Sequence, residues 1–216
     1  MKKHALGLLL VLIPAVVITA LEYPGTATGD DFLSLRVNPA SMAFGNAGGL
    51  AFIQPYLLEE EGENGPELLK DFSLQLASSS FGYYFDKTDS DYLHNILLAG
   101  EPFPNLYLGY RGSWLNGGLT DARGSLGLLA RPSDYLSLGA TVDDLFSSEM
   151  GGRLGAGVKP LAFRGVNPSL LTLGADLPWK SGFSRPVLHA ATEPLPGFSF
   201  SVAWDMEEEQ FTAGVS

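Results

Sequence analysis

The clearest pattern in this chain is an alternation of apolar residues with small or polar ones, which runs from residue 68 to the C-terminus. Successive side chains of a β-strand point to opposite faces, so a period of two predicts strands. No helical segment is predicted after residue 68, and the chain is therefore expected to be all-β. The alternation is plainest in residues 70–78, 105–114, 135–143, 170–177 and 197–205.

A repeated hairpin accompanies this alternation and is marked by prolines that recur roughly every thirty residues. Each of these prolines follows a charged residue and precedes a tight or slightly expanded turn and another alternating strand. The repeat has the length of two strands with their connections, so the prolines are predicted to lie on one rim. The prolines are Pro102, Pro132, Pro160 and Pro194. The opposite connections (115–122, 143–152, 178–186 and 206–210) are mostly longer and more polar, an asymmetry typical of outer-membrane barrels.

The first fifth of the chain has a different pattern. Lys2 and Lys3 precede an apolar run over 5–17 and a small-residue site at 18–20, which predicts a signal peptide over residues 1–20. An uncleaved anchor helix is the alternative. Residues 21–49 are expected to be irregular, with a short helix or turn that Asn38 caps and Pro39 begins. A strand is predicted over 50–57, and the acidic residues 58–67 are expected to form a solvated loop.

Composition narrows the class of protein. The chain has 216 residues, no cysteine, a formal net charge of −11 and a pI near 4.6. The acidic balance gives no basic surface for nucleic acid, and the lack of cysteine argues against a disulfide scaffold or a thiolate metal site. Only 17% of residues are charged and 26 are glycine, which is unusual for a soluble secreted domain.

A membrane barrel and a soluble β-sandwich both have strands in which apolar and polar residues alternate, so alternation does not distinguish them. The residues on the face opposite the apolar one do. This face carries mainly Gly, Ser, Ala and Thr, which suits an enclosed lumen, and the apolar face would then meet lipid. The sequence therefore predicts an antiparallel transmembrane β-barrel of about 12 strands over residues 50–216, either whole or part of a larger barrel, after a helical or plug segment at 21–49. Aromatic residues at or near strand ends would form interfacial girdles; they are Tyr83, Phe85, Tyr110, Trp114, Tyr135, Phe146, Trp179, Phe198 and Trp204.

Isolated charges on the small-residue face are the candidate functional residues. They form either a salt-bridge network that fills the lumen or a selectivity ladder for a solute. These candidate luminal charges are Arg111, Arg131, Arg153, Lys159, Asp143, Asp176, Glu193 and Asp205. No catalytic motif is present, and His94 and His189 lack partners at metal-ligand spacing. We therefore expect no enzymatic activity, no metal and no cofactor.

Several strings resemble the superfamily of long-chain fatty-acid transporters (FadL-like) and PorV-type outer-membrane barrels. They are NPA at 38–40, LGLLARPSDYLSLGATVDDL at 126–145 and VKPLAF with LTLGADL within 158–177. Similar hairpins, including one like residues 193–216, occur in barrel modules fused to signal peptide peptidase A-like proteases. The chain departs from the transporters in being shorter and in lacking a matching substrate-pocket motif.

The resemblance implies an outer-membrane location and either transport of hydrophobic small molecules or docking for secretion. Expected partners are outer-membrane lipid, a hydrophobic small-molecule ligand and a fused or partner periplasmic domain, but not nucleic acid. Two alternatives stay open: a non-catalytic barrel module of a signal peptide peptidase-like protein, and a soluble secreted β-sandwich that binds a ligand.

Overall fold

The computed structural model describes residues 25–28, 34–44, 49–53, 71–119, 122–195 and 198–215. The predicted signal peptide and the acidic loop at 58–67 lie outside these residues. Among the helices of the described part, none has both the length and the apolar character needed to cross a bilayer.

Twelve antiparallel strands form one sheet, in which each strand pairs with its neighbours in chain order. This confirms the prediction of an all-β chain with about 12 strands. The strands are β1 (Gly49–Ile53), β2 (Phe72–Ala77), β3 (Phe81–Thr88), β4 (Asp91–Phe103), β5 (Leu106–Leu115), β6 (Arg123–Ser133), β7 (Leu136–Asp143), β8 (Gly151–Val158), β9 (Thr172–Trp179), β10 (Val187–Leu195), β11 (Phe198–Asp205) and β12 (Gln210–Val215).

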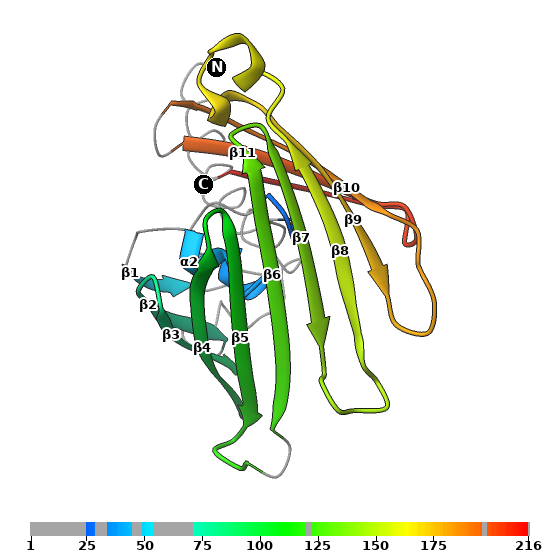
Figure 1. Cartoon of the computed structure of the whole chain (residues 1–216). Coiled ribbons are helices and arrows are strands. Elements are labelled where there is room, and N and C mark those ends of the chain that lie inside the picture. Colours follow the sequence, from blue (N-terminus) through cyan, green and yellow to red (C-terminus); the bar gives the residue numbers. More distant parts are fainter. Residues whose placement is uncertain are drawn as a thin grey trace, which may run out of the picture.

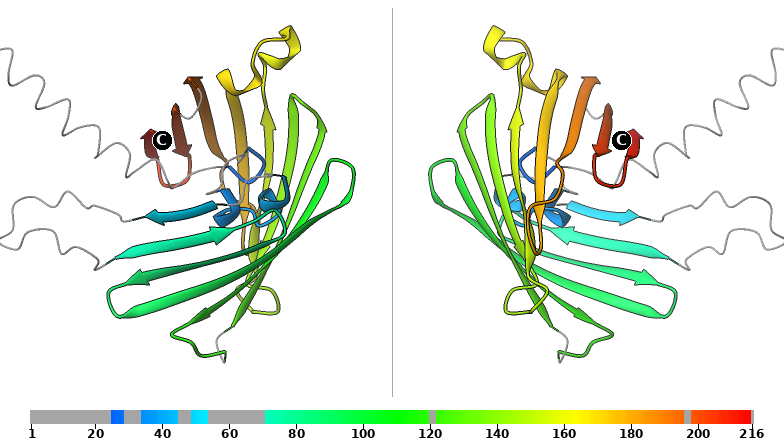
Figure 2. Two further views of the ribbon diagram at one scale, coloured as in Figure 1. Left: turned by 90° about the vertical axis from the view of Figure 1, so that its left-hand side faces the viewer. Right: turned by 90° about the vertical axis from the view of Figure 1, so that its right-hand side faces the viewer.

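The sheet curves strongly around a concave side, and its two edge strands lie on the same side of the molecule (Figures 1 and 2). The strands β1 and β12 are the edges of this sheet, and within the described residues they do not pair with each other. The sheet is therefore open at this position. Two short helices, η1 (Ser34–Arg36) and α2 (Ser41–Phe44), lie on the concave side.

The connections between strands fall on two rims, as the proline repeat predicted. The proline rim carries the β2–β3, β4–β5, β6–β7, β8–β9 and β10–β11 connections, and the long-loop rim carries the others. Register shifts occur between Gly100 and Phe103, between Ala130 and Ser133, and between Thr192 and Leu195. Each shift contains one of the repeated prolines. Because proline has no N–H for the ladder, it is tolerated where a bulge takes a residue out of the pairing.

The β8–β9 connection differs from the expectation that no helical segment follows residue 68. It contains two 3₁₀ turns, η2 (Ala162–Arg164) and η3 (Pro168–Leu170). Asn167 caps the second turn, since its side chain accepts a hydrogen bond from the backbone N–H of Ser169 at 3.0 Å. Proline in the first turn of a helix needs no N–H partner, which allows Pro168 to begin η3. The prediction missed these turns because each is too short to show a helical period.

The two faces of the sheet have the composition that the alternation indicated. On the convex outer face, leucines are largely exposed, with values of 53% for Leu76, 52% for Leu98, 48% for Leu126 and 47% for Leu138. On the concave inner face, polar and small side chains are buried. They include Gln75, Asn95, Ser125, Ser137, Thr141 and Asp176. The concave face also buries apolar side chains, among them Leu97, Tyr107 and Leu129, but a face of exposed leucines opposite a face with many buried polar side chains is the reverse of a water-soluble sheet protein.

Candidate functional site

The concave face holds a part of the chain that precedes β1, which we call the inner segment and define as residues 25–28 and 34–44 (Figures 1 and 2). Its residues Thr26, Ala27, Ser34, Asn38 and Ala40 are at most 2% exposed. A segment that contains two very short helices cannot bury this much backbone without partners, so the inner face must supply them. The inner segment and its seat on the sheet form the candidate functional site.

A row of glycines forms the seat of the inner segment. In the sheet register, Gly109 on β5 lies opposite Gly127 on β6, and Gly139 on β7 lies opposite Gly155 on β8. A Cβ atom at Gly109 would overlap the backbone of Pro39 and Ala40, and one at Gly139 would overlap the backbone of Thr26. Gly157 and Gly174, which are also opposite each other, face side chains instead: a Cβ atom at Gly157 would overlap the Thr28 methyl group, and one at Gly174 would overlap the His189 ring and the same methyl group. The glycines therefore let two backbones approach closely.

Asn38 connects three parts of the site with one buried side chain. Its Oδ1 accepts a hydrogen bond from the Ala40 N–H at 3.0 Å, and its Nδ2 donates to the Thr26 carbonyl at 2.8 Å. The same Nδ2 donates to the Leu128 carbonyl on β6 at 3.0 Å. Asn38 thus caps its own turn, joins the two pieces of the inner segment and attaches both to the sheet. The predicted capping role is only one of these three contacts.

Asp176 on β9 holds the first piece of the inner segment. Its Oδ2 accepts hydrogen bonds from the Thr26 N–H at 2.8 Å and from the Thr26 hydroxyl at 3.1 Å, and its Oδ1 lies 3.1 Å from the same N–H. The carboxylate is 4% exposed. His189 on β10 packs beside it against Gly25 and Gly174. A buried carboxylate that accepts several N–H and O–H bonds is a strong, directional attachment point.

Two arginines hold the second piece. Arg111 on β5 donates to the Arg36 carbonyl at 2.7 Å and pairs with Asp143 on β7 at 2.9 Å. Arg36 in turn pairs with Asp86 on β3 at 3.0 Å and donates through Nε to Gln75 on β2 at 3.1 Å. Charged contacts therefore run from β2 to β7 through the inner segment, and they link strands that do not pair directly.

Apolar contacts complete the seat near α2. The Arg131 guanidinium on β6 lies 4.0 Å from the centre of the Phe44 ring, and Phe44 meets Tyr107 edge-on with ring centres 5.5 Å apart. Met42 belongs to a buried cluster with Leu35, Ala77, Tyr84 and Leu97. These contacts bury the apolar side of the inner segment against β2–β6.

The remaining candidate charges lie toward the two rims. Lys159 follows β8 at the proline rim. Burial, with a smaller effect of the nearby charge of Arg131, holds its pKa below the usual value, and the Glu193 carboxylate offsets part of this decrease. Arg153 on β8 lies opposite Thr141 in the register and is half-buried. Asp205 ends β11 and accepts the backbone N–H groups of Glu207 and Glu208 at 2.8 and 3.2 Å.

The eight candidate luminal charges therefore do not form one continuous row of interacting side chains. Arg111 and Asp143 form an ion pair, and Lys159 and Glu193 interact. Asp176 and Asp205 instead bind backbone groups, of the inner segment and of a turn respectively.

Sequence reasoning missed several residues that hold the site, namely Thr26, Arg36, Gln75 and Asp86. One signal was available: glycine recurs on the small-residue face of five successive strands, at Gly109, Gly127, Gly139, Gly155 and Gly174. Such a row indicates a close backbone approach as well as a crowded lumen. The glycines alone did not indicate which segment of the chain approaches them.

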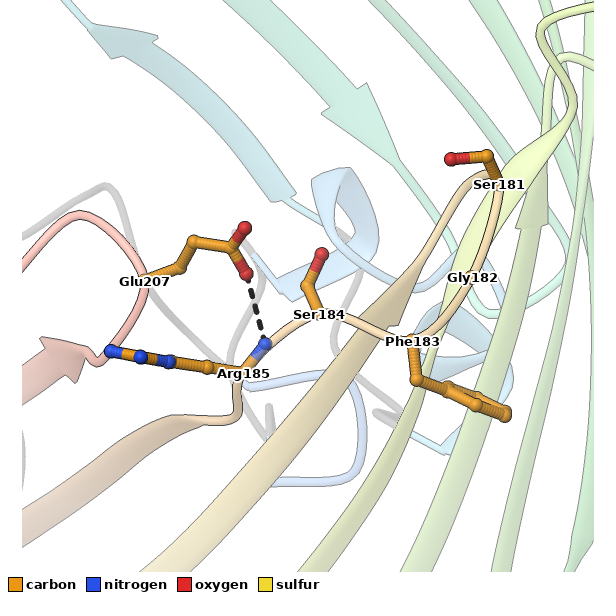
Figure 3. A pocket seen from close by; sticks show the side chains of 6 residues that line it. All are labelled: Ser181, Gly182, Phe183, Ser184, Arg185 and Glu207. Atoms are coloured by element: carbon orange, nitrogen blue, oxygen red, sulfur yellow. Dashed lines mark hydrogen bonds between the residues drawn. The ribbon is translucent and has the colours of Figure 1, made fainter.

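A hollow lies at the long-loop rim, between the β9–β10 connection and the β11–β12 turn (Figure 3). It is open and polar, and its lining is Ser181, Gly182, Phe183, Ser184, Arg185 and Glu207. The Arg185 N–H donates to the Glu207 carboxylate at 2.9 Å, which joins the two connections. The Phe183 ring points away from the two serine hydroxyls, so the hollow lacks an apolar wall.

Among the described residues, no group of three or more His, Cys, Asp or Glu side chains is placed to hold a metal ion. No protein-family model, no curated protein and no solved structure matches this chain.

Proposed function

We propose that this chain is an outer-membrane β-barrel protein that carries hydrophobic small molecules, with the inner segment as the closure of its passage. The observation that carries the proposal is the reversed polarity of the sheet. In water, leucines exposed across a whole sheet face would make the protein associate. In a bilayer, the same face meets acyl chains, and the polar inner face stays enclosed.

The positions of the tryptophans support this orientation. All three, Trp114, Trp179 and Trp204, lie within the last two residues of their strands at the long-loop rim. In the register they belong to the outer face, where Leu154 pairs with Leu177 and Leu188 with Trp204. Tryptophan is enriched at the boundary between hydrocarbon and headgroups. The long-loop rim therefore corresponds to one membrane interface.

Membrane insertion places a requirement on the sheet edges. Unpaired strand edges do not occur in hydrocarbon, because each free N–H and C=O group there costs several kcal/mol. We propose that β1 and β12 are joined in the membrane. An even number of antiparallel strands allows this closure, since the first and last strands then run in opposite directions.

The inner segment determines whether the enclosed space can conduct. It occupies the concave face from β2 to β9 through the contacts of Arg36, Asn38 and Thr26. Passage of a solute past it requires that some of these contacts open. Because the chain has no cysteine, an engineered disulfide can hold the segment in place without competing thiols.

Lipid contact is tested by fluorescence quenching of single-tryptophan variants in vesicles of brominated phosphatidylcholine. Trp114, Trp179 and Trp204 should each be quenched, and more strongly by bromine near the headgroup than by bromine near the acyl-chain end. The matched control is Tyr107→Trp in a variant without the native tryptophans, because Tyr107 faces the concave side and is 7% exposed. A chain that stays folded and monomeric in plain buffer, with no quenching, would contradict the proposal.

Transport through the concave side is tested with the pair Thr28→Cys and Gly157→Cys. The Cβ position of Gly157 lies 3.6 Å from the Thr28 Cβ, within the range of a disulfide. Oxidation should reduce liposome uptake of a fluorescent fatty acid to the protein-free background, and reduction should restore it. Thr28→Cys alone is the control and should be insensitive to oxidant; Gly157→Cys alone does not serve, because its Cβ would overlap the intact Thr28 methyl group.

A second candidate function, a non-catalytic docking module, is favoured by the same filled concave face. A barrel that its own chain seals needs no solute and could serve as a membrane anchor for another domain. Uptake that is equal to background in the reduced as well as in the oxidised double variant, while the tryptophans are quenched, would favour docking over transport.

A further inference from the structure

The last residue of α2, Phe44, places an aromatic ring against the concave face of the sheet. The guanidinium carbon of Arg131 on β6 lies over the face of this ring, 4.0 Å from its centre. Tyr107 on β5 meets the ring at 82°, with ring centres 5.5 Å apart. Phe44 also packs against a buried cluster in which Ala40 and Leu129 join Tyr107. We call Arg131, Tyr107 and Leu129 the ring site, because together they hold one aromatic ring.

The ring site favours an aromatic ring over an aliphatic ring of the same size. A cation is attracted to the electron-rich face of an aromatic ring, and an edge-on aromatic neighbour interacts favourably with the ring quadrupole. An aliphatic ring fills the same space without either interaction. The site does not require Arg131 to be otherwise unpaired. The N–H groups of a guanidinium lie in its plane, so they stay available to other partners when its face is covered.

The two ends of α2 are held in different ways. At its beginning, the Ser41 hydroxyl donates to the Asn38 carbonyl at 2.7 Å, and Asn38 is itself bonded to β6. At its end, the ring of Phe44 makes the contacts with the ring site. A helix of four residues is not stable by itself, so the position of its end depends on such packing. A ligand ring offers the ring site the same contacts and therefore competes with Phe44.

We infer that the ring site is a binding site for aromatic hydrophobic small molecules, for which Phe44 is the internal competitor. The inference rests on the proposed transport function and adds the class of molecule carried. A ligand ring takes the position of the Phe44 ring between Arg131 and Tyr107, and the end of α2 moves away from the sheet. The competition lowers the apparent affinity by the fraction of time for which the site is free. Removing Phe44 should therefore strengthen binding, whereas removing an ordinary lining residue weakens it.

The test compares fluorobenzene with fluorocyclohexane, two rings of similar size, by fluorine NMR titration of the full chain in detergent micelles against empty micelles. The unchanged chain should bind fluorobenzene more tightly. If Phe44 leaves the site free for about a tenth of the time, Phe44→Ala should raise the affinity for fluorobenzene about tenfold. Phe44→Leu removes the π face but keeps an apolar side chain, so it should raise the affinity by less. This second variant carries the test should Phe44→Ala not fold.

The role of the cation is tested by adding Arg131→Met to Phe44→Ala. This change should lower the preference for fluorobenzene about fivefold, the size of one cation–π contact, and leave the affinity for fluorocyclohexane nearly unchanged. The matched control is Met42→Ala, which opens space on the same helix beside Leu35 and Leu97, in a cluster that does not include Arg131. It should leave the preference between the two probes as it is in the unchanged chain.

Equal affinity for fluorobenzene in Phe44→Ala, Phe44→Leu and the unchanged chain would overturn the inference, and so would a preference that persists after Arg131→Met. Liposome uptake of the fluorescent fatty acid by the unchanged chain, measured in parallel, separates these failures from a failure of the proposed function. Uptake above background with no aromatic preference refutes the ring site alone, whereas uptake equal to background contradicts transport.

Discussion

Gly139→Val should displace the inner segment and lower the free energy of unfolding by about 1–3 kcal/mol. The Cβ of a valine at this position would lie 3.0 Å from the Ala27 Cα and closer still to the Thr26 carbonyl. Both are backbone atoms, so no side-chain rotation relieves the overlap. The expected result is a lower urea midpoint in detergent micelles together with faster hydrogen exchange of the amides at 25–28.

Gly100→Val is the matched control for this experiment. Gly100 also lies within a strand, β4, but a Cβ atom there would meet nothing within 4 Å. Valine favours strands over glycine, so this change should be neutral or slightly stabilising. Equal losses of stability at Gly139 and Gly100 would mean that the glycine row does not seat the inner segment and that both effects come from the strands alone.

The faces of the strands could be predicted because a period of two leaves only two possible assignments. The alternation placed Leu138 and Ser137 on opposite sides of β7, and the structure exposes the leucine and buries the serine. The rims could be predicted for a similar reason: Pro102 and Pro132 interrupt the ladder at bulges, so they had to lie at strand ends.

The contacts of the inner segment could not be predicted. Thr26 and Asp176 are 150 residues apart, and nothing local marks one as the partner of the other. Arg36 lies in a segment with no strand or helix period, so its pairing with Asp86 had no sequence signal. The glycine row did have a signal, but small residues also suit a lumen filled by side chains. Only the three-dimensional positions of residues 25–28 and 34–44 show that the glycines make room for a backbone.

Asp176→Ala should release the first piece of the inner segment and destabilise the fold by about 1.5–3 kcal/mol, the range for hydrogen bonds to a charged group. The substitution leaves the buried Thr26 N–H and hydroxyl without their acceptor. Asp176→Asn keeps one acceptor oxygen, so its loss should be smaller. In liposomes, both variants should take up more fluorescent fatty acid than the unchanged chain, in the same order, because the segment that closes the passage is held less firmly.

The double variant Asp176→Ala with Thr26→Val isolates the contact from other effects of the aspartate. If the Thr26 hydroxyl contributes mainly through Asp176, the double variant should lose less stability than the sum of the losses in the two single variants. Asp205→Ala is the control carboxylate: it lies two strands from Asp176 in the same cross-strand row, but it accepts its hydrogen bonds from backbone N–H groups of the β11–β12 turn. That change should cost about 1 kcal/mol or less as a lost turn cap and leave uptake unchanged. Uptake that rises equally in the Asp205 and Asp176 variants would show that general loosening of the fold, and not release of the inner segment, opens the passage.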